Sequence, residues 1–181
     1  MRSAPAIDGS VAYAAADNGR VRAYELAKGT VLWTAFAGGA PSGVALSGGA
    51  VLVGSNGGRL VALDSRSGAQ RWAFAAGAAI SSAPAVAYGL VYVGADDGTF
   101  YALEEQTGQG VWALPLGAAA SVPAIADGIV HVVTTDGVVH AVDAWAQREL
   151  GAVEAKARSS AAVVDGAVYV GTADGLAALG P

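Results

Sequence analysis

The stretch VYVGADDGTFYALEEQTGQGVW, residues 91–112, decides the fold of this chain. It places two β-rich segments, Val91–Val93 and Phe100–Leu103, on either side of the turn Asp96-Asp97-Gly98. Asp-Gly accommodates the positive φ angles of tight hairpin turns, so the stretch predicts two antiparallel strands. Apolar segments directly before and after this hairpin predict one more strand on each side. Four short strands fill about 39 residues, which leaves no room for a helix.

The same pattern recurs along the whole chain with a period near 39 residues. Each unit begins with a serine, at spacings of 39, 40, 39 and 39 residues: Ser3, Ser42, Ser82, Ser121 and Ser160. A turn that ends in glycine recurs in the same register, at Asn18-Gly19, Gly57-Gly58, Asp97-Gly98, Asp136-Gly137 and Asp174-Gly175. Self-similarity at such a period indicates a repeat architecture. We therefore predict one domain of five repeats, 3–41, 42–81, 82–120, 121–159 and 160–181.

Four-stranded units at this spacing predict an all-β fold, a β-propeller of antiparallel blades. A parallel β-helix is the main competitor, but its coils are shorter than this period and lack Asp-Gly hairpins. The fifth unit ends without a fourth strand, so we expect its blade to have three strands. Three forms remain open: a five-bladed ring, an open arc, or a part of a larger propeller. An open arc would expose apolar faces on its end blades and would favour self-association.

The composition excludes several classes of protein. Hydrophobic residues make up 54% of the chain and charged residues 14%, which rules out a disordered chain. The net charge is −5 and no basic cluster occurs, so we expect no nucleic-acid partner. The absence of cysteine excludes disulfides, thiolate metal sites and a cysteine nucleophile.

The sequence also predicts neither a signal peptide nor a membrane-spanning segment. Residues 1–5 lack a charged region followed by an apolar core. The window Trp72–Ala95 carries no charge and is long enough to cross a membrane. It is interrupted by Gly, Ser and Pro, which are poor residues for a helix interior.

A second motif, A-x-[DE]-x-x-x-G-x-x-x-W, occurs with identical spacing in the first three units. Its glycines are Gly29, Gly68 and Gly108, and its tryptophans are Trp33, Trp72 and Trp112. The glycine suits a turn between the third and fourth strands, and an indole offers a flat apolar face with one N–H donor. We expect each tryptophan to be a structural docking residue that lies across the neighbouring blade. The fourth unit departs from the motif, with Gln147 in the place of the glycine and Gly151 in that of the tryptophan.

These motifs resemble the tryptophan-docking repeat of quinoprotein-like propellers, the PQQ-like repeat family. The Ser-x-Pro-Ala and Val-Tyr-Val-Gly segments fit that family as well, and the resemblance covers essentially the whole chain. The family includes PQQ-dependent dehydrogenases, cell-envelope propellers of outer-membrane assembly, and sensor propellers of bacterial receptor kinases. The resemblance implies a periplasmic or other extracytoplasmic location.

One face of such a propeller is the candidate binding face. Loops that enter the first strand of each blade share this face with the hairpins between the second and third strands. The first set presents Ser3, Ser42, Ser82, Ser121 and Ser160, and the second presents Asp17, Asn18, Asn56, Asp96, Asp97, Asp136 and Asp174. Together they could form a polar cup for a ligand, although the same residue types are ordinary turn formers. His131 and His140, which replace aromatic strand residues, are not expected to bind a metal.

We expect a non-catalytic binding or scaffold module with no cofactor and with a protein partner or small ligand on the loop face. Neither a G-x-S-x-G motif nor a Walker A loop occurs. A fragment of a PQQ-dependent dehydrogenase, which would bind PQQ with Ca²⁺, is one alternative. Against it, the in-register tryptophans belong to fourth strands and the vicinal cysteines of many such enzymes are absent. An extracellular sensor propeller of a bacterial receptor kinase is the other alternative.

Overall fold

The computed structural model describes residues 4–180, which form nineteen strands in five antiparallel sheets. Blade 1 contains β1 (Ala6–Asp8), β2 (Val11–Ala15), β3 (Arg20–Glu25) and β4 (Val31–Phe36). Blade 2 contains β5 (Pro41–Ser47), β6 (Ala50–Ser55), β7 (Arg59–Asp64) and β8 (Gln70–Ala75). Blade 3 contains β9 (Ala85–Ala87), β10 (Leu90–Gly94), β11 (Thr99–Glu104) and β12 (Gly110–Pro115).

Blade 4 contains β13 (Ala124–Ala126), β14 (Ile129–Val133), β15 (Val138–Asp143) and β16 (Glu149–Glu154). Blade 5 has three strands, β17 (Ala162–Val164), β18 (Ala167–Thr172) and β19 (Gly175–Leu179). Within each blade the strands pair in chain order, so every blade is a simple meander. The predicted all-β fold and the three-stranded last blade are confirmed. Residues 4–180 contain no helix that is long and apolar enough to cross a membrane.

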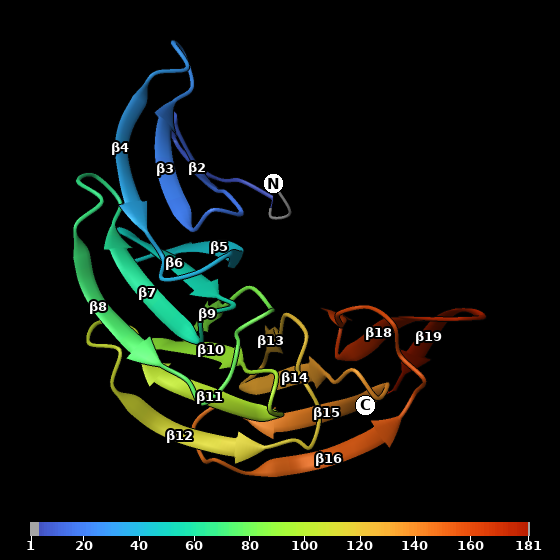
Figure 1. Ribbon diagram of the computed structural model, residues 1–181. Helices are drawn as coiled ribbons and strands as arrows, with labels where there is room; N and C mark the ends of the chain where they lie inside the picture. The colour runs from blue at the N-terminus through green and yellow to red at the C-terminus, as the bar shows by residue number, and fades with distance from the viewer. Residues whose placement is uncertain (1–3, 181) are drawn as a thin grey trace.

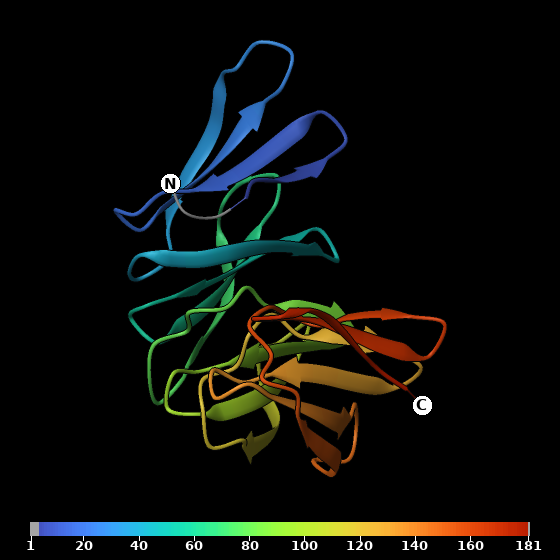
Figure 2. The same cartoon turned by 90° about the vertical axis from the view of Figure 1, so that its right-hand side faces the viewer.

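The five blades follow one another along an open arc, as Figure 1 shows from one side and Figure 2 from the side at right angles to it. The first strands of successive blades contact one another and line the inside of the arc. The fourth strands, β4, β8, β12 and β16, lie on the outside. The described residues therefore do not form a closed five-bladed ring, whereas an open arc and a part of a larger propeller both agree with this arrangement.

The core consists of four apolar layers, each between two neighbouring blades. Side chains alternate between the two faces of a strand, so one strand contributes to two layers. Val51 and Val53 of β6 pack against blade 1, whereas Leu52 packs against blade 3. All six residues of β6 are buried, which explains the continuous apolar runs in the sequence. Blades 1–4 also share a register shift on the third strand, directly after Ala23, Ala62, Ala102 and Ala141.

Two tryptophans bridge neighbouring blades in the same way. The indole N–H of Trp33 donates to the Ser65 carbonyl of blade 2 at 2.8 Å, and that of Trp72 donates to the Glu105 carbonyl of blade 3 at 2.9 Å. The two rings lie over Gly68 and Gly108, where a Cβ atom would collide with them. These glycines have positive φ angles of 72° and 69°, so they serve both the turn and the close approach of the ring.

The third tryptophan, Trp112, is placed differently. Its ring is buried against blade 4, but its Nε1 has no partner among the described residues. The equivalent carbonyl, that of Ala144, instead accepts the hydroxyl of Tyr92 at 2.9 Å. Burial raises the pKa of Tyr92 to about 12, which keeps this hydroxyl protonated as a donor. Gln147, in the place of the docking glycine, keeps a positive φ of 41° and donates its side-chain amide to Ala113 at 2.6 Å.

The substitution Gly68→Ala should destabilise the protein more than Gly29→Ala does. The φ angles are 72° and 67°, so both variants bear a similar backbone cost. A Cβ at Gly68 would lie 2.7 Å from Cδ2 of Trp33, whereas nothing lies within 4 Å of a Cβ at Gly29. We expect the free energy of unfolding to fall by ~1–3 kcal/mol more in the first variant, the usual cost of overpacking. Urea denaturation of both variants measures the difference, and equal losses would show that the indole contact contributes nothing.

Candidate functional site

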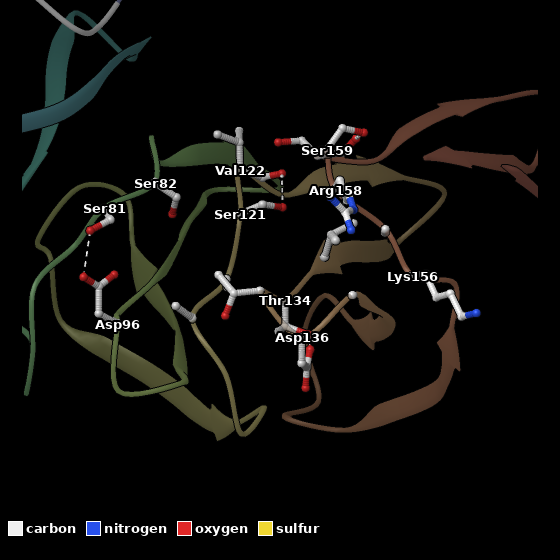
Figure 3. A pocket seen from close by; sticks show the side chains of 17 residues that line it. Ser81, Ser82, Asp96, Ser121, Val122, Thr134, Asp136, Lys156, Arg158 and Ser159 are labelled. Carbon is white, nitrogen blue, oxygen red and sulfur yellow. Dashed lines mark hydrogen bonds between the residues drawn. The ribbon is translucent and has the colours of Figure 1, made fainter. Parts of the chain in front are cut away.

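The loop face carries a pocket of about 1220 Å³ that spans blades 3, 4 and 5 (Figure 3). We call it the loop-face pocket. Its walls come from the loops that enter β9, β13 and β17 and from the hairpins β10–β11 and β14–β15. Loops and hairpins therefore share one face in blades 3 and 4, as the family resemblance implies, and blade 5 adds its entering loop. The lining residues are Ser81, Ser82, Asp96, Ala119, Ala120, Ser121, Val122, Val133, Thr134, Thr135, Asp136, Gly137, Lys156, Ala157, Arg158, Ser159 and Ser160.

Five of the predicted site residues lie together in this pocket: Ser82, Ser121, Ser160, Asp96 and Asp136. The others do not line it. Ser42 donates its hydroxyl to the Ser82 carbonyl at 2.9 Å, which ties blade 2 to blade 3. Asn18, Asn56 and Asp97 accept backbone N–H groups of Arg20, Ala40 and Thr99, so they stabilise loops of the candidate face. Asp17 and Asp174 lie in the β2–β3 and β18–β19 turns, and Ser3 lies outside the described residues.

The blade 3 side of the pocket is acidic and hydroxyl-rich. Asp96 accepts a hydrogen bond from the Ser81 hydroxyl at 2.8 Å. Next to it, Ser82 is only 7% exposed, and its Oγ has no hydrogen-bond partner among the described residues. Figure 3 shows these three side chains grouped on one side of the pocket. A buried hydroxyl without a partner is costly, so Ser82 is an unsatisfied polar group in the wall of the pocket.

The blade 4 side contains a polar chain that the sequence did not predict. Thr134 donates its hydroxyl to Asp136 at 2.5 Å and lies 3.1 Å from Nε2 of His140. The other ring nitrogen of the buried His140 lies 2.6 Å from the carboxylate of Glu149. The Thr134 hydrogen bond lowers the pKa of Asp136, so this carboxylate stays charged at neutral pH. No local sequence motif identifies this series of hydrogen-bonded side chains, because the pairing of β15 with β16 brings His140 and Glu149 together.

The blade 5 side is basic. Lys156 and Arg158 belong to the connection between β16 and β17, and both are exposed. Backbone hydrogen bonds hold this connection: Ala155 and Ala157 donate to the Gly137 carbonyl at 3.2 and 3.1 Å, and the Arg158 N–H donates to Gly171 at 2.7 Å. Within residues 4–180, neither basic side chain forms an ion pair within 4.0 Å. Figure 3 places Arg158 beside Ser159 on this side, with Lys156 at the outer edge.

This arrangement suits binding by charge and hydrogen bonds. None of the described residues that line the pocket has an aromatic side chain. The described residues contain no group of three or more His, Cys, Asp or Glu side chains that could hold a metal ion. The pocket instead offers serine hydroxyls, one acidic side and one basic side. It fits a polar ligand or an extended segment of a protein.

His131, the other histidine, lies on β14 and is partly buried. Burial lowers its pKa below the ordinary 6.5, because the charged ring would lose hydration. Its contribution to stability is therefore fully present above pH 6.5 and is lost as the pH falls below 6.5 toward the lowered folded-state value. In the variant His131→Tyr, which restores the residue of the Tyr92 register, we expect a smaller loss of stability between pH 7 and pH 5.5. Urea midpoints at both pH values measure this, and identical losses in the two proteins would contradict the assignment.

Comparison with known proteins identifies relatives of this chain. A family model described as outer membrane protein assembly factor BamB matches residues 17–118 and 100–181. The crystal structure of BamB from Moraxella catarrhalis superposes on 98% of the chain with a TM-score of 0.82 and 24% identity. The computationally designed proteins Ika8 and Ika4 superpose on 98% and 79% of it, with TM-scores of 0.88 and 0.72 and 20% identity each.

The solved structures show the fold of the chain and not its activity. The matched region covers 57% of the BamB chain, 57% of the Ika8 chain and 92% of the Ika4 chain. The present chain thus spans somewhat more than half the length of the first two. None of the curated proteins compared matches it.

Proposed function

This chain belongs to the family of the outer membrane protein assembly factor BamB, and from that premise we propose that it is a non-catalytic binding or scaffold module. Its loop face would receive a segment of a protein partner, in a periplasmic or other extracytoplasmic compartment. No cofactor is needed for this role. The proposal rests on one observation above all, the loop-face pocket that three successive blades build together.

The construction of the pocket supports this role. Its walls are loops and hairpins anchored on buried strands, so the lining groups are held in place before a partner arrives. Its volume of about 1220 Å³ exceeds the roughly 300–1,000 Å³ of typical small-molecule sites. Its polar groups lie on three blades and do not converge on one point, which suits an extended segment better than a compact reactant.

Site-specific crosslinking tests the proposal. A photoreactive amino acid at Ser121, inside the pocket, should crosslink the full chain to a component of outer-membrane protein assembly in a bacterial envelope. The same amino acid at Ser67, in the β7–β8 turn at the opposite end of the blades, is the matched control and should not. Crosslinks of equal yield from both positions would contradict a role for the loop face. So would stoichiometric retention of added PQQ with Ca²⁺ through gel filtration, because it would favour the dehydrogenase alternative.

We also propose that the chain self-associates through its end blades. On the outer face of blade 5, Val164 is 56% exposed and Leu176 is 73% exposed, and on blade 1 Ile7 is 61% exposed. Apolar side chains in these positions of the inner blades are covered by a neighbour, so the end faces gain most from association.

The substitution Leu176→Lys should weaken this association, because it places a charge on the apolar face. We expect the weight-average mass in sedimentation equilibrium to rise with concentration for the parent chain and to rise less for the variant. Val111→Lys is the control, since Val111 is 50% exposed but lies on β12 at the outer side of the arc. A parent chain that remains monomeric at all concentrations would refute the proposal.

A further inference from the structure

The two basic residues of the loop-face pocket depart from the repeat. When the blades are aligned on their starting serines, Lys156 occupies the place of Gly38 and Gly117, which both have a φ of 87°. Arg158 occupies the place of alanines in two of the sister loops, Ala40 and Ala119. In the connection to blade 3 the same places hold Ala78 and Ile80, so the other connections between blades carry uncharged residues where this one carries two cations.

Lys156 keeps the backbone conformation of the glycine that it replaces. Its φ is 51°, which is strained for a residue with a Cβ atom. Among the described residues, four other non-glycine side chains have positive φ. Three of them precede a glycine in a tight hairpin, and the fourth is Gln147 in the β15–β16 turn. Lys156 alone among them lies in a connection between blades, and glycine would be the easier choice for the fold there.

The basic side chains are also presented without an internal partner. The acidic residues of the pocket are Asp96 and Asp136, and both accept hydrogen bonds from neighbouring hydroxyls. Neither forms an ion pair with Lys156 or Arg158 within the described residues. In a chain with a net charge of −5, this connection is a local basic site that faces Asp96 across the pocket, while the hairpin that carries Asp136 packs against it through Gly137. Such a pocket favours a ligand that brings a negative charge to its blade 5 side.

We propose that the loop-face pocket binds an acidic peptide segment of the protein partner, with a carboxylate on Arg158 and with Lys156 adding to the attraction. The buried Ser82 hydroxyl, which has no partner among the described residues, lies on the opposite side of the pocket. Asp96 repels a second carboxylate and so confines the acidic group to the basic side. This inference rests on the proposed function, since it names the chemistry of the segment that the loop face receives.

Titration of the full chain with two capped peptides tests the inference. The acidic probe is Ac-Ser-Ala-Glu-Ala-Ser-NH₂, and the control replaces its glutamate by glutamine. In ¹⁵N-resolved NMR spectra we expect the acidic peptide to shift the amides of Ser121, Thr134 and Arg158. We expect it to bind about tenfold more tightly than the control, the effect of one charge-assisted contact. The difference should shrink between 0.05 and 0.5 M NaCl, because salt screens the pair.

Variants separate the charge from the fold. Arg158→Gln should reduce the affinity for the acidic peptide about tenfold. Lys156→Gly should reduce it without lowering the melting temperature, because glycine relieves the strained backbone. Asp96→Asn should leave it unchanged or increase it. Arg66→Gln, in the turn at the opposite end of blade 2, removes an equal charge and should have no effect.

Each contrary result has a distinct meaning. Equal binding of both peptides at the loop face would overturn the acidic assignment and leave the proposed function intact. Failure of both peptides, together with absent crosslinks from Ser121, would overturn the proposed function as well. Inorganic phosphate that competes as well as the acidic peptide would reveal a simple anion site and refute the inference. Binding to vesicles of anionic phospholipid in preference to the peptide would refute it too, because the partner would then be a membrane surface.

Discussion

Every blade of this chain is apolar on both faces, so no blade can cover itself. Val51 and Val53 of β6 need blade 1, and Leu52 on the same strand needs blade 3. The hydrophobic effect therefore acts between blades rather than within them, and each blade is stable only when it has a neighbour. The Trp33 and Trp72 indoles make the packing specific. Each ring lies on a glycine of the next blade and donates to one carbonyl there, which fixes the relative orientation of the two blades. The arc, its spacing and the shared loop face all follow from that requirement.

Features that depend on local backbone chemistry could be predicted from the sequence. Asp97-Gly98 favours a tight turn, and a short continuous apolar run indicates a strand that is buried on both faces, so strand number and repeat register follow directly. The meeting of Ser82, Ser121 and Ser160 with Asp96 and Asp136 follows from the repeat, because equivalent loops of successive blades lie side by side. The Thr134–His140–Glu149 chain could not be predicted, since it depends on the pairing of β14, β15 and β16 and on side-chain rotamers. Lys156 and Arg158 stand where other connections have uncharged residues, and this difference is visible in the sequence. Its importance becomes clear only in the structure, which places their loop beside the pocket.

The blades become less regular toward the C-terminal end of the arc. Trp33 and Trp72 satisfy their N–H groups, the Nε1 of Trp112 has no partner among the described residues, and blade 4 has Gly151 in place of a tryptophan. The loop-face pocket lies over these irregular blades and not over blades 1 and 2. Regular packing and polar side chains compete for the same strand positions, so this region gives up part of its packing for a polar surface.

A repeat protein offers an internal control that a single domain lacks, because equivalent positions share one backbone geometry. Where the geometry demands glycine and glycine is present, as at Gly38 and Gly117, the fold explains the residue. Where the geometry is kept and the residue is Lys156, the fold explains the φ angle but not the side chain. A lysine side chain is flexible and strongly hydrated, so a relaxed position nearby would serve its solvation equally well. A lysine at a strained position therefore suggests that its location matters. This departure from local preference is therefore the observation behind the proposal that the pocket edge binds a partner.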